Sequence, residues 1–309
     1  MSEVMVGSSA RALVMRSPAK INLFLHITGQ RSDGYHLLET VFQFLDFADT
    51  LKFEVRKDRR IVRRDEHEFS LPKNDLIIRA AELLRKEFHT EFQSSDAPGV
   101  RITLTKKIPP GSGMGGGSSN AATTLLALNR LWNLGLTRDD LLPLAARLGA
   151  DVPLFIYGKS CWATGIGDVF ERFEPPQHWC CMCLPSVAVS TSAVFSRFDQ
   201  RGHSSITKKA LSKKAMIKKA MIKNTLIKNR AQTGNTANDL EPITRALHPE
   251  VDQALKTLSL YGDAKMNGSG CSIYLRCDSK DQASEICRKM PSHLNCAVTR
   301  TLNDITEYS

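Results

Sequence analysis

The segment of this chain best suited to chemistry is a run of five glycines within seven residues. The sequence G-S-G-M-G-G-G-S-S extends from Gly111 to Ser119, between an alternating segment at 100–105 and apolar residues at helical spacing over 122–132. Glycine lets the backbone approach a ligand closely, and a helix that begins at Ser118 or Ser119 points its free N–H groups and positive dipole end at the same place. The order of strand, glycine loop and helix therefore predicts an anion site, above all for phosphate.

Other interpretations of the glycine loop fit the sequence less well. A flexible linker is not usually held between a strand and a strong helix. No Gly-Lys-Ser or Gly-Lys-Thr follows the loop, so it is not a Walker A motif. Gly111, Gly113 and Gly116 have the spacing of a dinucleotide fingerprint, but the preceding segment alternates and Pro109 and Pro110 intervene. A phosphate site is the favoured hypothesis, with the linker and the dinucleotide fold as alternatives.

The second candidate for chemistry is Asp151, in the sequence G-A-D-V-P. A helix is predicted upstream, because Thr137 and Asp140 form a capping box and Gly149 is a natural end. The apolar run 154–157 predicts a strand downstream. Asp151 would then lie on a helix-to-strand connection, where its carboxylate can project into a cleft. A carboxylate just after a helix is electrostatically unfavourable, so a purely helix-capping role is disfavoured.

The last third of the chain predicts a second set of elements that could complete the site. The sequence indicates a turn at Asn267-Gly268-Ser269-Gly270, then a strand, a helix and a further strand at 271–277, 279–290 and 296–299. Strands and helices in such mixed order are typical of an α+β fold. We expect two domains, 1–165 and 166–309, since the length suits two.

The composition excludes several classes of protein. With 309 residues, 42% hydrophobic and 24% charged, the chain resembles an ordinary globular protein, and no apolar stretch reaches the ~18 residues of a membrane span. The segment 1–10 has neither a basic region nor an apolar run, so we expect no signal or transit peptide and a cytoplasmic location. The eight cysteines lack zinc-ligand spacing and are interpreted as reduced thiols, with no metal site.

The net charge of +10 is concentrated in one segment. Between His203 and Thr233 there are nine basic residues and no acidic residue, so the rest of the chain is nearly neutral. Methionine, leucine and isoleucine recur among the lysines about every five residues, and no aromatic residue is present for base stacking. We interpret this insert as a solvated loop or loose helix, with a membrane or RNA patch as the alternative.

Three ordered motifs carry a resemblance to a known family. The stretch from Pro110 to Ala122 resembles the phosphate-binding motif of GHMP kinases, Ser17 to Asn22 resembles their amino-terminal motif, and Asn267 to Cys271 resembles their last glycine turn. Further segments, 33–36, 39–49 and 148–153, are similar to family members that phosphorylate a cytidylated sugar alcohol. The lysine-rich insert departs from the family pattern, as do Ser112 in the loop and the residues Ser269-Gly270-Cys271.

The resemblance implies a fold and a reaction. The amino-terminal domain would be like the second domain of ribosomal protein S5 and the carboxy-terminal domain ferredoxin-like, with the active site between them. The reaction would be the transfer of the ATP γ-phosphate to a hydroxyl of a cytidylated sugar alcohol, in isoprenoid precursor biosynthesis. ATP would be the co-substrate, with Mg²⁺, and neither nucleic acid nor membrane would be a partner.

The resemblance also implies roles for individual residues. Asp151 would be the base that faces the acceptor hydroxyl, with Lys20 beside it. Tyr35 and Phe195 would sandwich the cytosine ring and His36 would bind its edge. The adenine side would consist of Leu76, Ile77 and Lys106. The remaining acceptor contacts would come from Asn22, Gly268 and Ser269. The phosphate loop would consist of Pro110, Gly111, Ser112, Gly113, Met114, Gly115, Gly116, Gly117, Ser118 and Ser119.

Two rival functions remain open from the sequence. Another GHMP kinase, acting on mevalonate, homoserine or a galactose-like sugar, would not need Tyr35, His36 and Phe195. An RNA-binding protein with an S5-like domain would use the basic insert. Without the family motif, an isolated Tyr-His pair or a phenylalanine is more often ordinary packing.

Overall fold

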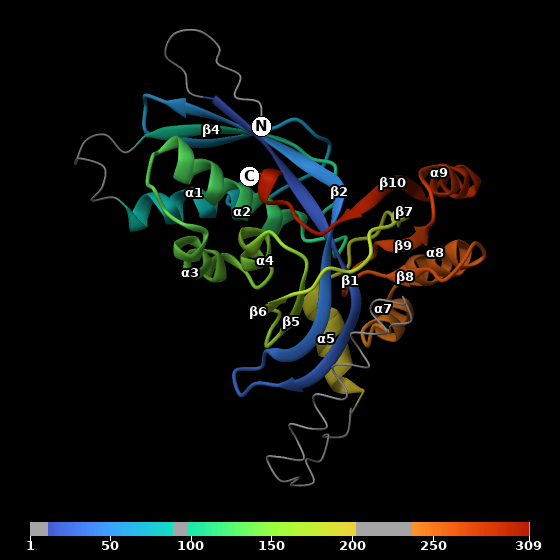
Figure 1. The fold of residues 1–309 in the computed structure, drawn as a ribbon. Coiled ribbons are helices and arrows are strands. Elements are labelled where there is room, and N and C mark those ends of the chain that lie inside the picture. Colours follow the sequence, from blue (N-terminus) through green and yellow to red (C-terminus); the bar gives the residue numbers. More distant parts are fainter. Residues whose placement is uncertain (1–11, 89–97, 202–236, 309) are drawn as a thin grey trace.

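The computed structural model describes residues 12–88, 98–201 and 237–308, shown in Figure 1. The strands in these ranges are β1 (Ala12–Gln30), β2 (His36–Arg56), β3 (Ile61–Asp65), β4 (Gly99–Thr105), β5 (Cys161–Thr164), β6 (Val169–Arg172), β7 (Trp179–Leu184), β8 (Lys265–Met266), β9 (Ile273–Cys277) and β10 (Asn295–Leu302). The helices are α1 (Leu76–Glu87), α2 (Gly116–Leu131), α3 (Arg138–Leu148), α4 (Val152–Tyr157), α5 (Thr191–Gln200), α7 (Glu241–Leu247), α8 (Pro249–Ser259), α9 (Lys280–Lys289) and the short 3₁₀ helix η1 (Thr306–Tyr308). This mixed order confirms the predicted α+β class.

A long antiparallel ribbon of β1 and β2 runs through the whole molecule (Figure 1). The pairing extends from Ala12 opposite Glu54 to Gln30 opposite His36. The register of β1 shifts twice near its middle, between Pro18 and Lys20 and again before Leu25. Such irregularities re-aim side chains, and here they occur where β1 passes the predicted site.

The amino-terminal half is a sheet covered by helices. β4 pairs with β2 on one side and β3 on the other, and helices α1 to α4 lie together over one face of this sheet (Figure 1). Val100 and Ile102 of β4 are fully buried while Arg101 is exposed, as the alternating sequence predicts. Residues from this sheet and these helices form one hydrophobic core.

The carboxy-terminal half is a second layer, in which β7 lies between β10 and β9, and β8 lies at the edge. Its core contains residues of α5, α7, α8 and α9. β10 also pairs with β2 through Thr301 and Leu302, which joins the two halves into one sheet system. A third cluster contains residues of both halves, among them Ile21 of β1, Met114 of the glycine loop and Tyr274 of β9.

Local capping explains where several helices begin. The predicted capping box of α3 is present, with Thr137 and Asp140 bonded reciprocally, and α3 ends at Gly149. The predicted helix at 279–290 is α9, with Ser279 as its N-cap. α2 begins earlier than predicted, at Gly116, because the glycines after Gly115 adopt helical geometry.

The strand predicted for residues 154–157 is wrong. These residues belong to α4, which spans Val152–Tyr157 and has Asp151 as its N-cap residue. Pro153 lies in the first turn, where the missing N–H costs no helical hydrogen bond. A short apolar run cannot distinguish a buried strand from a buried helix by periodicity. Asp151 therefore lies on a helix-to-helix connection between α3 and α4.

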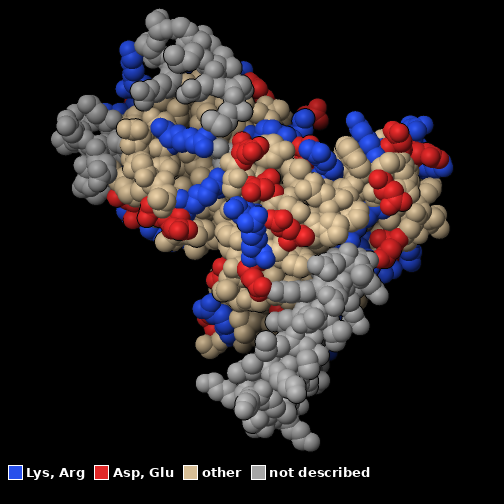
Figure 2. All heavy atoms as spheres, in the orientation of Figure 1, with Lys and Arg blue, Asp and Glu red and all other residues tan. Residues whose placement is uncertain are grey.

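The domain division at 165/166 stays a prediction. Residues 165–168 form the turn between the paired strands β5 and β6. The predictions for segment 1–10 and for the insert at 203–233 lie outside the described residues. Figure 2 shows basic and acidic side chains interspersed over one face of the described part, as expected when the excess charge belongs to the insert. Within the described ranges, no helix combines the length and apolar character needed to cross a bilayer.

Candidate active site

A cleft of about 1310 Å³ brings the predicted motifs together. This volume exceeds the ~300–1,000 Å³ usual for a pocket that holds one ligand, so the cleft has room for two substrates. The predicted residues that line it are Lys20, Asn22, Tyr35, His36, Leu76, Lys106, Pro110, Gly111, Ser112, Gly113, Gly115, Gly116, Gly117, Ser118, Asp151, Phe195, Gly268 and Ser269.

Three predicted residues lie behind the cleft lining. Ile77, Met114 and Ser119 are fully buried. The backbone oxygen of Met114 accepts a hydrogen bond of 3.0 Å from the Lys20 N–H, which ties the glycine loop to β1. The Ser119 hydroxyl accepts a 2.8 Å hydrogen bond from Ser17. Packing therefore distinguishes the adjacent serines: Ser118 lines the cleft and Ser119 faces the protein interior.

The start of α2 forms the base of the glycine loop. Gly115 is the N-cap residue, and no side chain caps the helix. Gly116, Gly117 and Ser118 of the first turn all line the cleft. The first N–H groups of a helix have no partner within the helix, and the positive end of the helix dipole lies there. This end of the cleft is therefore suited to phosphate oxygens.

The glycine loop is locked against the turn at Asn267–Gly270. A Cβ atom on Gly270 would lie 2.4 Å from the Gly113 nitrogen and 2.5 Å from the Gly113 Cα. Gly113 has a φ of +77°, a conformation that favours glycine. The Ser272 hydroxyl donates a 2.7 Å hydrogen bond to the Ser112 carbonyl. Two backbones can approach this closely only because both positions lack a side chain.

The buried side chain of Asn267 connects all three motifs. Its Nδ2 group lies 3.2 Å from the carbonyl oxygens of Lys20 and of Gly113. Its Oδ1 atom accepts a 2.8 Å hydrogen bond from the Asn22 N–H. One fully buried amide thus fixes the spacing between β1, the glycine loop and the last glycine turn.

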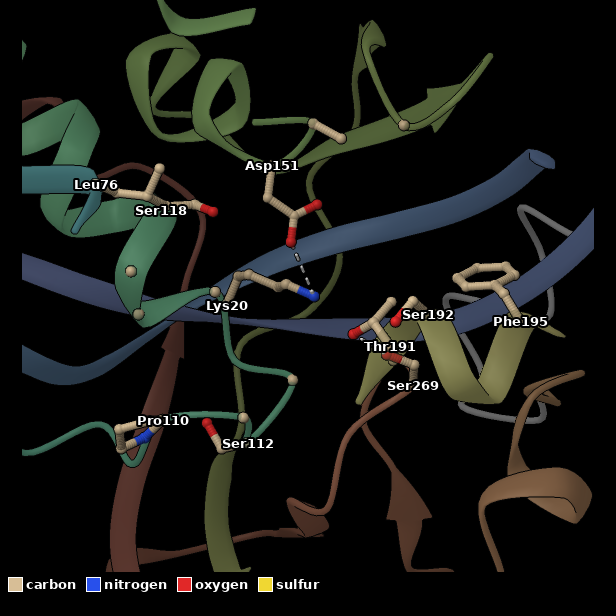
Figure 3. A pocket seen from close by; sticks show the side chains of 18 of the residues that line it. Lys20, Leu76, Pro110, Ser112, Ser118, Asp151, Thr191, Ser192, Phe195 and Ser269 are labelled. Atoms are coloured by element: carbon tan, nitrogen blue, oxygen red, sulfur yellow. Dashed lines mark hydrogen bonds and ion pairs between the residues drawn. The ribbon is translucent and has the colours of Figure 1, made fainter. Parts of the chain in front are cut away.

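Lys20 and Asp151 face each other across the middle of the cleft (Figure 3). The Lys20 Nζ atom lies 3.8 Å from Asp151 Oδ2 and donates a 2.7 Å hydrogen bond to Asn22 Oδ1. The Lys20 side chain is almost fully buried, whereas 39% of the Asp151 side chain is exposed. Burial lowers the pKa of Lys20 below its usual value, and the Asp151 carboxylate opposes this shift.

Lys106 is held beside the start of α2 by a buried carboxylate. Its Nζ atom donates a 2.7 Å hydrogen bond to Asp49 Oδ2. The fully buried Asp49 also accepts hydrogen bonds from the Ile108 N–H and from Asn120 Nδ2, so the buried charge is well satisfied. A Cβ atom on Gly116 would lie 3.3 Å from the Lys106 ammonium, which places a positive charge beside the start of α2.

The aromatic residues predicted for cytosine binding lie at the other end of the cleft. The rings of His36 and Phe195 are stacked, with centroids 4.7 Å apart and an interplanar angle of 27°. Tyr35 lines the same cleft but is 58% exposed. The structure therefore pairs Phe195 with His36, and one face of the Phe195 ring is covered by the imidazole.

Of the cleft-lining residues of α5 that the sequence interpretation missed, Thr191 and Asp199 bind predicted site residues. The Thr191 hydroxyl lies 2.8 Å from the Ser269 hydroxyl and connects α5 to the last glycine turn. The Asp199 Oδ1 atom lies 2.7 Å from the His36 Nε2 atom, within hydrogen-bond distance. Asp199 follows Phe195 by four residues, and on a helix this spacing places both on one face. That spacing is the only sequence signal that could have indicated Asp199.

The geometry divides the cleft into two ends with a reactive centre between them. In Figure 3, Leu76 and Ser118 lie on one side of Lys20 and Asp151, and Phe195 lies on the other. Phosphoryl transfer requires mainly that donor and acceptor be positioned in line and that the transferred charge be stabilised. An anion site, a buried ammonium group and a partly exposed carboxylate in one cleft are suited to that chemistry.

Known families and proteins support this interpretation. Residues 75–159 match the GHMP kinases N terminal domain, and residues 217–296 match the GHMP kinases C terminal family. The 4-diphosphocytidyl-2-C-methyl-D-erythritol kinase of Herminiimonas arsenicoxydans is 40% identical over 89% of this chain and 90% of its own length. The kinase of the same name from Nitrosococcus oceani is 41% identical over 94% of this chain and 95% of its own length.

A solved structure agrees with the sequence matches. The crystal structure of a 4-(cytidine 5'-diphospho)-2C-methyl-D-erythritol kinase superposes with a TM-score of 0.72 at 28% identity and covers 94% of this chain and 99% of its own. The glycine loop and Asp151 both fall within the matched amino-terminal domain. Since both family domains match and the similar proteins align over nearly their whole length, this chain belongs to the GHMP kinase family of ATP-dependent phosphotransferases.

Proposed function

We propose that this GHMP kinase transfers the ATP γ-phosphate to the 2-hydroxyl of 4-diphosphocytidyl-2-C-methyl-D-erythritol. This reaction belongs to the methylerythritol phosphate pathway of isoprenoid precursor biosynthesis, and we propose that it takes place in the cytoplasm. The observation that carries the proposal is the Lys20–Asp151 pair between an anion site and an aromatic end of one cleft. The names of the relatives, at 40% to 41% identity over most of the chain, specify the acceptor.

The residues of this chain suggest how the transfer proceeds. The first turn of α2 would bind the ATP phosphates, with Lys106 beside them, while Leu76 contacts the nucleotide. The Asp151 carboxylate would take the proton of the acceptor hydroxyl as the oxygen attacks the γ-phosphorus and ADP leaves. The Lys20 ammonium would stabilise the negative charge on the transferred group from within a water-poor site.

Oxygen atoms suited to Mg²⁺ are present at the phosphate end of the cleft. The Ser118 hydroxyl lines the cleft, whereas the Ser119 hydroxyl is buried and bonded to Ser17. In the described ranges, no group of three or more His, Cys, Asp or Glu residues could hold a metal ion by itself. This fits Mg²⁺, which commonly keeps water and phosphate ligands beside few protein ones. We propose Ser118 as its protein ligand, and bound Mg²⁺ would neutralise charge on the ATP phosphates.

A substrate panel tests the proposed reaction. Purified protein is expected to consume ATP with 4-diphosphocytidyl-2-C-methyl-D-erythritol at a kcat/KM far above that with mevalonate or homoserine. The product should carry phosphate on the 2-hydroxyl, which phosphorus NMR can show. Preference for mevalonate or homoserine would assign the chain to another acceptor within the same family.

Removal of either aromatic ring should weaken binding of the acceptor and leave binding of ATP unchanged. Tyr35→Ala and Phe195→Ala are each expected to raise the acceptor KM about tenfold, since stacking on a base is worth about 1–3 kcal/mol. Steady-state kinetics should show an ATP KM close to the wild-type value. Tyr261→Ala removes a partly exposed tyrosine that lies outside the cleft lining and serves as the control. Equal effects on both substrates would indicate misfolding and refute the assignment.

The lysine-rich insert should be dispensable for catalysis. Replacement of residues 205–231 by a short Gly/Ser linker is expected to lower the isoelectric point sharply, because nine basic residues are lost. Loops of different length close at similar entropic cost, so folding should persist. Isoelectric focusing and kcat/KM measure the two effects. A folded variant without kinase activity would show that the insert contributes to the site.

A further inference from the structure

One face of α5 encloses the imidazole of His36 at the start of β2. Phe195 stacks on the ring, Phe198 meets it edge-on at 6.0 Å, and Asp199 binds its Nε2 atom at 2.7 Å. These three residues are spaced i, i+3 and i+4, so they lie side by side on the helix. The His36 side chain is only 10% exposed, while 46% of the Asp199 side chain is exposed.

The hydrogen bond to Asp199 restricts what His36 can offer a ligand. An ionised carboxylate only accepts hydrogen bonds, so the bond requires that Nε2 carry the proton. In the neutral imidazole the other nitrogen, Nδ1, then has a lone pair and is an acceptor. A carbonyl oxygen has no proton to give to it, whereas an exocyclic amine does.

We propose that Asp199 is a positioning residue that fixes the tautomer of His36 and thereby makes the cleft select an amino-pyrimidine over a keto-pyrimidine. The proposal rests on the proposed function, in which His36 binds the edge of the cytosine. The cytosine amine donates to Nδ1, while uracil presents an oxygen lone pair at the same position and leaves two acceptors facing each other. Sites built around one such hydrogen bond reject the analogue that cannot make it.

Kinetics with a matched substrate pair test the selection. The wild type is expected to prefer the cytidylated acceptor over its uridylated analogue by about 10- to 100-fold in kcat/KM. Asp199→Ala frees the imidazole to protonate Nδ1 and should reduce this preference about tenfold, mainly through the two KM values. The kcat with the cytidylated acceptor should change less than threefold, because Lys20 and Asp151 are untouched.

Two further variants separate the tautomer from the charge. Asp199→Asn loses the charge but keeps an oxygen that accepts from Nε2, so it should retain most of the preference. Asp281→Ala removes an exposed carboxylate from α9, outside the cleft lining, and should leave the preference unchanged. Equal loss of preference in Asp199→Asn and Asp199→Ala would show that the negative charge of Asp199, and not its hydrogen bond to Nε2, causes the selection. This result would overturn the proposal.

A spectroscopic measurement tests Asp199 without any substrate. The ¹⁵N chemical shifts of the His36 imidazole should indicate protonated Nε2 in the wild type and a mixture of tautomers in Asp199→Ala. The same tautomer in both proteins would overturn the proposal. If the wild type failed to phosphorylate the cytidylated acceptor while the shifts behaved as expected, the proposed acceptor would be wrong and the positioning role of Asp199 would stand.

Discussion

Asp151→Asn is expected to lower kcat by about 10²–10⁴-fold, the usual contribution of a general base. The substitution keeps the shape of the side chain and removes its ability to take a proton. The Asp151 side chain makes no capping hydrogen bond to α4, and 39% of it is exposed. Its carboxylate therefore does not cap the helix. The affinity for ATP should persist because, in the proposed function, the phosphates are bound by α2 and the glycine loop and not by Asp151. Single-turnover and steady-state kinetics on the folded variant measure the effect.

The matched control for Asp151 is Asp139→Asn, on the exposed first turn of α3. This change removes a carboxylate from a neighbouring element that does not line the cleft. It should cost a few tenths of a kcal/mol in stability and leave kcat unchanged. A kcat of Asp151→Asn within threefold of the wild type would exclude Asp151 as the base and leave Lys20 and phosphate positioning as the source of catalysis.

Gly270→Ala should destabilise the protein by about 2–3 kcal/mol and abolish ATP binding. The new methyl group would lie within 2.5 Å of backbone atoms of Gly113 and Ser112, which cannot rotate away as a side chain can. The glycine loop and the last glycine turn must separate to accommodate it. Denaturant unfolding measures the loss of stability, and nucleotide titration of the folded fraction measures the loss of binding.

Gly117→Ala is the control for Gly270. A Cβ atom at Gly117 has Leu76 Cδ1 at 3.7 Å as its nearest neighbour, which is an ordinary contact. Gly117 also lies within α2, where alanine is favoured over glycine by up to ~1 kcal/mol. The unfolding midpoint of Gly117→Ala should therefore equal or exceed that of the wild type. An unchanged midpoint for Gly270→Ala would show that the two turns are not locked together.

The features that were predicted correctly from the sequence depend on residues that are close together along the chain. The capping box at Thr137, the helix at 279–290 and the glycine loop each have a signal contained within a few residues, and all are present. The run 154–157 failed because four apolar residues fit a buried strand and a buried helix equally well. The glycine-loop motif could not show which of Ser118 and Ser119 lines the cleft. The hydroxyl of Ser119 is buried because it binds Ser17, which lies 102 residues earlier.

The assembly of the cleft depends on contacts between distant residues. Lys20 and Asp151 lie 131 positions apart in the sequence, and only the family resemblance suggested that they meet. The pair of His36 and Asp199 spans 163 positions and belongs to no motif that we identified. Periodicity and propensity report what one element prefers, and they do not report which elements pack together.

The buried amide of Asn267 also determines when the phosphate site can exist during synthesis. Asn267 lies 154 residues after Gly113, whose carbonyl it binds. At ~5–20 residues per second, a ribosome needs roughly 8–30 s to reach it after making the glycine loop. During this interval Ser112 and Gly113 lack the turn that locks them. We therefore expect a nascent chain to acquire the proposed phosphate site only near the end of translation. Fragments that stop before residue 267 should carry the whole glycine motif without binding ATP.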